Sequence, residues 1–160
     1  MKKVIILIIV VLYWGHLEAQ DQYVCTNIGL REGLSNNFVL DMAFDKQGFL
    51  WVTTESGLNR ICGNTHIIYK KENSGIISNE VSSLYADTVN DKMWIATKQD
   101  GLCIYDGVTH QFRQFSITEG LATDAVSCIA QATGDRIWIL HWNGQVQLYD
   151  NRSRKLGIVI

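Results

Sequence analysis

One compound motif occurs three times in the chain, at residues 48–60, 92–105 and 136–149. Each copy holds a tryptophan within an apolar run, followed by a glycine. The motif tryptophans are Trp51, Trp94 and Trp138, at intervals of 43 and 44 residues. The glycines are Gly57, Gly101 and Gly144, at intervals of 44 and 43 residues. A period of this length is typical of one supersecondary unit repeated along a chain. The repeat therefore constrains the fold class more strongly than any single residue does.

Each repeat contains four short segments rich in β-branched and aromatic residues and bounded by turn residues. The predicted strands are residues 39–45, 49–54, 58–62 and 67–71; 81–87, 92–97, 102–106 and 111–117; and 126–131, 136–141, 146–150 and 155–160. The tryptophan strands are apolar on both faces, unlike strands of a sheet with one solvated face. Four-stranded sheets packed face to face bury both faces. The prediction is an all-β propeller chain with about three four-stranded blades and no long helix.

Some repeated residues are interpreted as structural. The glycines at 57, 101 and 144 close the turn between the second and third strands, where a side chain would clash. The Thr-His pairs at 65–66 and 109–110 are read as equivalent turn residues rather than as a paired site. Asp106 and Asp150 each close a third strand, which also indicates a structural role.

The repeats divide the chain into a lead-in at residues 20–33 and blades at 34–75, 76–119 and 120–160. Residues 23–28 are predicted to form one further strand, which would complete a final blade. Propeller rings usually have four to eight blades. Three blades indicate the N-terminal part of a larger protein or a truncated gene product. Further blades, or a second copy of the chain, are expected to cover the open blade faces.

The first nineteen residues are predicted to be a signal peptide. Lys2 and Lys3 precede an apolar run at residues 4–14, and Ala19 precedes the expected cleavage point. The apolar run is shorter than the roughly 20 residues that a membrane-spanning helix needs, although an uncleaved signal anchor is the alternative. Export of the chain is therefore expected.

Export makes disulfides possible. The four cysteines are Cys25, Cys62, Cys103 and Cys128. Their positions in the repeats are not equivalent, which favours unpaired thiols, although three ways of pairing all four stay open. There is no Cys-x-x-Cys and no histidine pair at ligand spacing, so no metal or other cofactor is expected.

Charge and motif content narrow the function. The net charge of −2 argues against nucleic acid as a partner, because such partners need a basic surface. The serines at 82, 83 and 127 lie within predicted strands and lack a Gly-x-Ser-x-Gly context. No catalytic constellation is evident, and a propeller glycosidase or lyase fragment is the less favoured enzyme alternative.

Residues that differ between blades are the candidates for ligand binding. The turns between second and third strands and the crossovers between blades open on the same face of a propeller. The candidates in these turns are Trp142, His141, Asn143, Glu55, Lys98 and Asp100. Trp142 either packs against a neighbouring blade or offers a stacking platform for a sugar ring. The crossovers add side chains that suit hydroxyl groups but equally suit turn formation: Asn36, Asn37, Asn79, Glu80 and Asp124.

The first copy of the motif has a known counterpart. Gly-Leu-Ser-Asn-Asn at residues 33–37, with Val39 and the run from Asp45 to Arg60, closely resembles the two-component regulator propeller repeat. The resemblance covers residues 23–160, although His141 and Gln145 depart from it in the third copy. It implies the periplasmic sensor portion of a hybrid two-component system, responding to oligosaccharides and non-catalytic by itself. No kinase motif follows in this chain. A propeller scaffold for protein interaction is the alternative.

Overall fold

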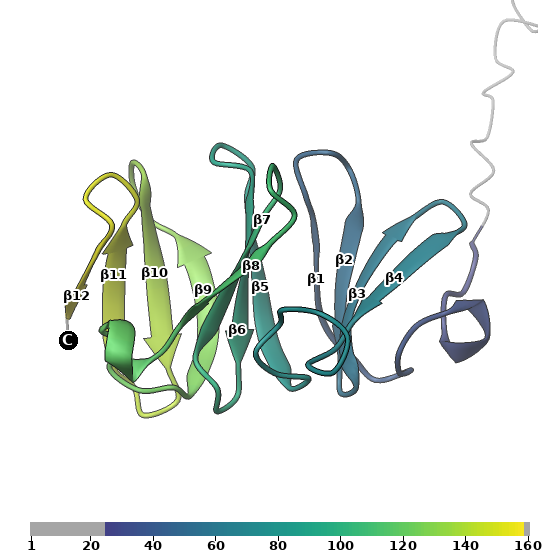
Figure 1. The fold of residues 1–160 in the computed structure, drawn as a ribbon, viewed down its shortest axis with the longest axis horizontal. Helices are drawn as coiled ribbons and strands as arrows, with labels where there is room; N and C mark the ends of the chain where they lie inside the picture. The colour runs from purple at the N-terminus through teal and green to yellow at the C-terminus, as the bar shows by residue number, and fades with distance from the viewer. Residues whose placement is uncertain (1–24, 159–160) are drawn as a thin grey trace, which may run out of the picture.

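The computed structural model describes residues 25–158, and the predicted signal peptide lies outside them. The described chain is almost entirely β (Figure 1). Its strands are β1 (Val39–Phe44), β2 (Leu50–Thr54), β3 (Gly57–Cys62), β4 (Thr65–Tyr69), β5 (Val81–Asp87), β6 (Lys92–Thr97), β7 (Leu102–Asp106), β8 (Phe112–Phe115), β9 (Val126–Gln131), β10 (Arg136–His141), β11 (Val146–Asp150) and β12 (Lys155–Ile158). No helix in this part of the chain is long and apolar enough to span a membrane.

The strands form three four-stranded antiparallel sheets, each built from four consecutive strands. We call them blade 1 (β1–β4), blade 2 (β5–β8) and blade 3 (β9–β12). They stand face to face in a row (Figure 1), which confirms the predicted propeller-type fold. First strands of successive blades are tied together by polar contacts. The Asp41 carboxylate accepts hydrogen bonds from the Leu84 amide and the Ser83 hydroxyl, and the Ser82 hydroxyl donates to the Val126 carbonyl.

Each first strand carries an irregularity near its start. The pairing register with the second strand shifts between Val39 and Asp41 in blade 1 and between Val81 and Ser83 in blade 2. In blade 3 it shifts opposite the end of β10, between Leu140 and His141. A β-bulge at this position increases the local twist, and in the first two blades it brings Asp41 and Ser83 to the same interface.

Two apolar cores lie between the blades, and the repeated tryptophans are at their centres. Trp51 is fully buried between blades 1 and 2, beside Val81 and Met93. Trp94 is fully buried between blades 2 and 3, beside Val126 and Ile137. The tryptophan of each blade therefore faces the following blade. Trp138 is only half-buried, because its side of blade 3 has no following blade among the described residues.

The Gly-Leu pairs of the motif end two short 3₁₀ helices, η1 (Leu30–Glu32) and η2 (Ile117–Glu119). Gly33 and Gly120 close these turns at φ of 108° and 105°, a left-handed conformation that favours glycine. The leucine that follows each glycine is buried: Leu34 against blade 1 and Leu121 against blade 3. The sequence pattern did not predict these single turns, since three residues are too few to show a helical period.

Four sequence-based expectations need correction. Cys25 to Ile28 form no strand; they pair with no other strand of the described chain, and Tyr23 and Val24 lie outside it. The fourth strands are also shorter than predicted or start earlier: β4 covers Thr65–Tyr69 and β8 covers Phe112–Phe115. These strands lie at blade edges, where only one neighbour supports them.

The two Thr-His pairs are not structurally equivalent. His66 lies inside β4, opposite Ile61, whereas His110 lies in a turn at φ 59°. The difference originates four residues before each histidine. The Asp106 carboxylate accepts hydrogen bonds from the Val108 and Thr109 amides and holds a longer loop open. Cys62 cannot accept them in this way, and the chain turns tightly so that Cys62 pairs with Thr65.

A clash explains only some of the turn glycines. A Cβ at Gly101 would meet the Phe115 carbonyl oxygen, and one at Gly57 would lie 3.0 Å from the Tyr69 carbonyl oxygen. A Cβ at Gly144 would meet nothing within 4 Å, so the expected clash is absent there. What Gly144 contributes is its φ of 86°, which residues with a side chain rarely adopt.

Candidate functional site

The candidate ligand-binding turns lie together along one rim of the row of blades, the lower edge in Figure 1. In every blade the residue after the second strand donates its amide hydrogen to a carbonyl of the preceding crossover. These bonds run from Glu55 to Phe38, from Lys98 to Glu80 and from Trp142 to Ala125. Glu55, Lys98 and Trp142 therefore occupy equivalent places, and we call this surface the crossover rim.

Trp142 is the large aromatic residue on the crossover rim of blade 3. Its side chain is 64% exposed, although its backbone is fixed by the bond to Ala125. Packing against a neighbouring blade, one of the two interpretations of this residue, is absent among the described residues. An exposed indole on an anchored backbone offers a flat apolar face to a ligand.

The other candidates differ widely in accessibility. Glu55, Asp100 and Asn143 are exposed, and Lys98 is half-buried. The Asn143 side chain is used within its own turn, where it bonds the amide and the side chain of Gln145.

His141 does not lie on the surface. It is 1% exposed, its Nε2 lies 2.9 Å from Oε1 of Gln147, and its Nδ1 lies 3.4 Å from the Thr123 hydroxyl. Gln147 in turn bonds the backbone of Ala122 and Gly120. His141 therefore fixes the crossover from inside the blade, and its imidazole does not face a ligand on the crossover rim. Strand alternation turns it inward while the next residue, Trp142, points outward.

The crossover amides and acids hold the backbone in all three repeats. Asn37 accepts a hydrogen bond from the Leu30 amide, Asn79 from the Lys71 amide and Asp124 from the Ile117 amide, each at 2.8 Å. Asn36 likewise accepts from the Phe38 amide at 2.7 Å. Turn formation therefore accounts for these four side chains. Glu80, the remaining candidate, is exposed.

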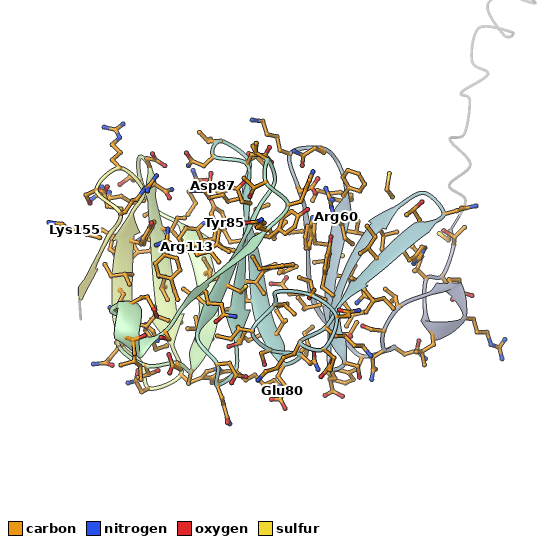
Figure 2. All side chains as sticks on the ribbon, in the orientation of Figure 1. Arg60, Glu80, Tyr85, Asp87, Arg113 and Lys155 are labelled. Carbon is orange, nitrogen blue, oxygen red and sulfur yellow. The ribbon has the colours of Figure 1, made fainter. Side chains whose placement is uncertain are left out.

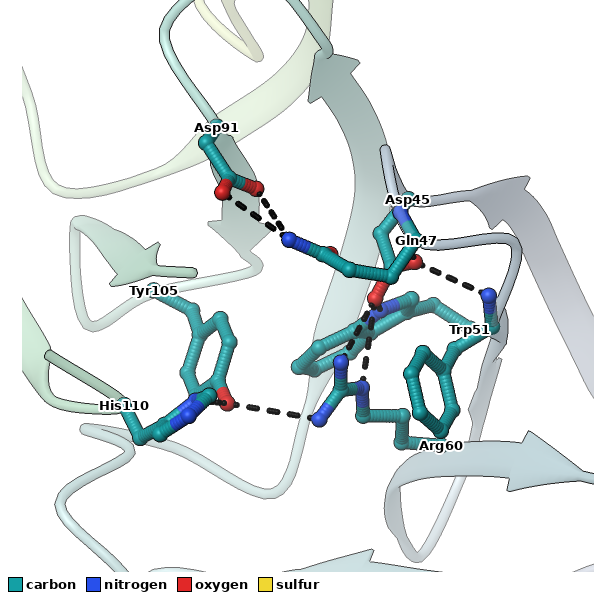
Figure 3. A network of polar contacts seen from close by, with 8 residues as sticks. Asp45, Gln47, Trp51, Arg60, Asp91, Tyr105 and His110 are labelled. Carbon is teal, nitrogen blue, oxygen red and sulfur yellow. Dashed lines mark hydrogen bonds and ion pairs between the residues drawn. The ribbon is translucent and has the colours of Figure 1, made fainter. Parts of the chain in front are cut away.

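A polar network that sequence reasoning missed lies at the opposite rim, between blades 1 and 2 (Figure 3). Arg60 of β3 forms a salt bridge of 2.9 Å with Asp45, and the two side chains are 9% and 10% exposed. Asp45 also accepts the indole hydrogen bond of Trp51 at 2.8 Å. The Arg60 guanidinium lies 3.8 Å from the centre of the Phe49 ring. Asp45 and Arg60 both belong to the repeat motif, and this was the available signal of the network in the sequence. Their contact could not be predicted, because it depends on the β1–β2 turn.

The network continues into blade 2. Arg60 donates to the Tyr105 hydroxyl at 3.5 Å, and this hydroxyl lies 2.8 Å from Nδ1 of His110. Nearby, the Gln47 amide bonds both carboxylate oxygens of Asp91. Burial raises the pKa of Tyr105 to about 12, so its hydroxyl stays protonated at neutral pH. The arrangement closes this part of the interface and leaves no room for a ligand, since the cavity beside it measures only about 10 Å³.

The described residues hold no arrangement typical of catalysis or metal binding. No cluster of three or more metal-ligating side chains occurs among residues 25–158. Within the same range the four cysteines are unpaired, with Cys103 buried and the others exposed. Burial raises the pKa of the Cys103 thiol to about 11, which makes it a poor nucleophile. Ser82 and Ser83 are committed to the contacts between blades.

The three-blade fold, the repeated motif and the anchored turns define a segment of a β-propeller. Residues 33–56 match the family described as two component regulator propeller, so the predicted resemblance is confirmed for this segment. The comparison with curated proteins gives no match.

Solved structures extend the similarity to most of the chain. It is similar to the extracellular domain of BT3049 from B. thetaiotaomicron, described as a hybrid two component system, with 35% identity and a TM-score of 0.77. The match covers 85% of this chain but 20% of that domain, so the chain spans about a fifth of its relative. The extracellular domain of BT4673 from the same organism shares the fold at 22% identity over 79% of this chain and 19% of that one, with a TM-score of 0.67. PorZ of Porphyromonas gingivalis, a component of the type-IX secretion system, also shares the fold, at 14% identity over 76% of this chain and 29% of that one, with a TM-score of 0.51.

Proposed function

We propose that the chain is the ligand-sensing portion of an exported, periplasmic two-component regulator and that it binds an oligosaccharide on the crossover rim around Trp142. Its similarity to extracellular domains of signalling proteins supports the sensor role. The observation that carries the ligand site is Trp142, a 64% exposed indole on a fixed turn. Sugars offer apolar ring faces edged by hydroxyl groups, and an exposed indole suits such a face.

The polar neighbours on the rim fit the same ligand class. Glu55, Lys98 and Asp100 lie on the equivalent turns of blades 1 and 2 and offer acceptors and a donor to hydroxyl groups. On this proposal the chain performs no catalysis and passes the binding event to the rest of a longer protein. Signalling would then depend on the change in free energy that the ligand produces between two states of that protein.

Calorimetry of the protein against a panel of neutral and acidic oligosaccharides tests the proposal. Trp142→Ala is expected to weaken binding by about 1–3 kcal/mol, as for other aromatic stacking platforms, while Trp142→Phe keeps most of the affinity. Phe38→Ala is the matched control, because Phe38 is a 58% exposed aromatic on the same rim of blade 1. Equal affinity of the protein and of Trp142→Ala for the oligosaccharide would contradict the assignment of the site to Trp142. Turnover of a glycan would contradict the proposal that the chain is non-catalytic.

One observation favours a second candidate, a scaffold for protein interaction. Blade 1 exposes Met42 and Phe44 on its outer face, at 67% and 64%, and blade 3 exposes Leu140 at 39%. Exposed apolar patches often mark contacts with other proteins. Under this alternative, substitutions on the outer blade faces change partner binding and those on the crossover rim do not.

A further inference from the structure

The two interfaces between blades differ at equivalent positions. The interface between blades 1 and 2 holds the polar network around Arg60, whereas the interface between blades 2 and 3 contains a cavity. In blade 1 the residue paired with the tryptophan is Arg60, and in blade 2 it is Ile104. Tyr105 and Tyr149 occupy equivalent places on the facing blades, opposite Met93 and Ile137. Ile104 is shorter than arginine and apolar, so it supplies no guanidinium to this interface. A cavity of about 150 Å³ lies beside it, lined by Lys92, Ile104, Asp106, Arg113, Tyr149 and Arg154.

Three of these six residues are cations, and they come from three different elements. Lys92 begins β6, Arg113 is in β8 opposite Ile104, and Arg154 is in the loop before β12. Figure 2 shows Arg113 between blades 2 and 3. Asp106 is the one carboxylate of the lining, so the cavity wall has an excess of two positive charges. The whole chain has a net charge of −2, which makes this concentration of cations a local feature.

The three cations have limited compensation from the protein: Arg113 and Arg154 are exposed, and the Arg113 guanidinium lies 4.6 Å from the centre of the Phe115 ring. Within residues 25–158, none of the three forms a salt bridge. The Asp106 carboxylate accepts hydrogen bonds from the Val108 and Thr109 amides and is used in its own loop. The three cations line one cavity, and a bound anion would offset their mutual repulsion.

The wall also holds a hydrogen-bond donor and a fixed backbone. Burial raises the pKa of Tyr149, although Arg113 and Arg154 oppose the shift, so the hydroxyl is protonated at neutral pH. In the described chain this hydroxyl has no protein partner, whereas Tyr105 contacts Arg60 and His110. Arg154 has a φ of 55°, an uncommon conformation for a residue with a side chain, and its loop is held by Asp150 through the Arg152 and Ser153 amides.

We propose that this cavity, the anion pocket, binds an oxyanion, namely a sulfate or carboxylate group. Guanidinium groups match the oxygen geometry of such anions, and Lys92 and Tyr149 add donors. The oxyanion is either a free inorganic ion or the acidic substituent of a sugar. The pocket is formed by residues separate from the crossover rim, so the proposal stands independently of the sugar site around Trp142.

The first arm of the test uses sodium sulfate, followed by calorimetry and by amide chemical shifts, with sodium chloride at matched ionic strength to separate binding from screening. We expect saturable binding of sulfate that Arg113→Gln and Arg154→Asn each weaken about 10- to 100-fold, because each removes a charge-assisted hydrogen bond. Asparagine is chosen at 154 because it tolerates the left-handed backbone. Arg152→Gln is the matched control: Arg152 is two residues away and exposed but does not line the pocket, and sulfate binding should not change.

The second arm separates the two sources of the oxyanion. Glucuronate and a sulfated monosaccharide are compared with glucose and with free sulfate. Tighter binding of the acidic sugars, with the same sensitivity to Arg113→Gln, identifies a sugar substituent; binding of free sulfate alone identifies an inorganic ion. The proposal is overturned if sulfate and both acidic sugars fail to bind, or if Arg113→Gln, Arg154→Asn and Arg152→Gln behave alike. Failure of the sugar site would instead appear as loss of neutral oligosaccharide binding while sulfate still binds.

Discussion

Arg60 and Asp45 form a salt bridge of 2.9 Å that is about nine-tenths buried, at the boundary between blades 1 and 2. The same carboxylate accepts the Trp51 indole hydrogen bond. In the next interface the equivalent indole, that of Trp94, is buried with no partner in the described chain, and Ile104 replaces the arginine. The two interfaces are therefore built on one backbone plan but stabilised by different chemistry.

The salt bridge leads to the first prediction. Arg60→Leu should lower the free energy of unfolding by about 3–5 kcal/mol, because it leaves a buried carboxylate without its counter-charge. Combining it with Asp45→Asn should recover part of the loss, since the amide carries no charge. Urea unfolding of the protein, the two single variants and the double variant measures this coupling. Strictly additive effects of the two substitutions would contradict the prediction.

Two glycines give a matched pair for the second prediction. Gly101 and Gly144 have nearly equal φ angles of 88° and 86° and lie in equivalent turns. A Cβ at Gly101 would meet the Phe115 carbonyl oxygen, whereas one at Gly144 has open space. Gly144→Ala should therefore destabilise the fold by only about 1 kcal/mol, from backbone strain alone. Gly101→Ala should cost clearly more in thermal unfolding, and equal losses would show that the clash relaxes freely.

The periodicity of the sequence was sufficient to predict the strands. Each tryptophan lies in a short apolar run, and turn residues separate the segments, so strands such as β5, β6 and β10 have the predicted bounds. Differences between repeats were harder to interpret. His66 and His110 occupy the same motif position, but Asp106 replaces Cys62 four residues earlier and changes the loop.

The site was predictable only in part, for a related reason. The crossover rim follows from the order of strands, so Glu55, Lys98 and Trp142 could be grouped from the sequence. Whether a side chain on that rim points outward depends on strand alternation and on a buried partner. His141 has such a partner in Gln147, six residues away, and no pattern in the sequence marks that pair. The anion pocket likewise depends on residues of two blades that only the packing brings together.

The outer blade faces support a third prediction. The mature chain, residues 20–160, should by itself self-associate, because Met42 and Phe44 are exposed at one end of the row and Leu140, beside the half-buried Trp138, at the other. Phe44→Glu and Leu140→Glu should each shift sedimentation toward the monomer, whereas Val108→Glu, on an exposed loop, should not. A compact monomer at high concentration would argue that the faces need no cover.

The last prediction concerns alkaline pH and the buried thiol of Cys103. Burial raises its pKa from 9.0 to about 11, because the thiolate is disfavoured in the core. A folded pKa above the unfolded value means that the contribution to stability is fully present below pH 9 and is lost as the pH rises through 11. Within this window the free energy of unfolding should fall by up to about 1.4 kcal/mol per pH unit from this group alone.

Cys103→Ala removes the thiol and should make the curve of stability against pH flatter between pH 9 and 11. Its absolute stability at pH 7 should be lower, since a fully buried side chain is truncated. The tyrosines also ionise at high pH, so the decisive quantity is the difference in slope between the protein and the variant. Cys128→Ala is the control, because it removes an exposed thiol instead of a buried one. Identical slopes for the protein and Cys103→Ala in urea unfolding from pH 8 to 11 would contradict the prediction.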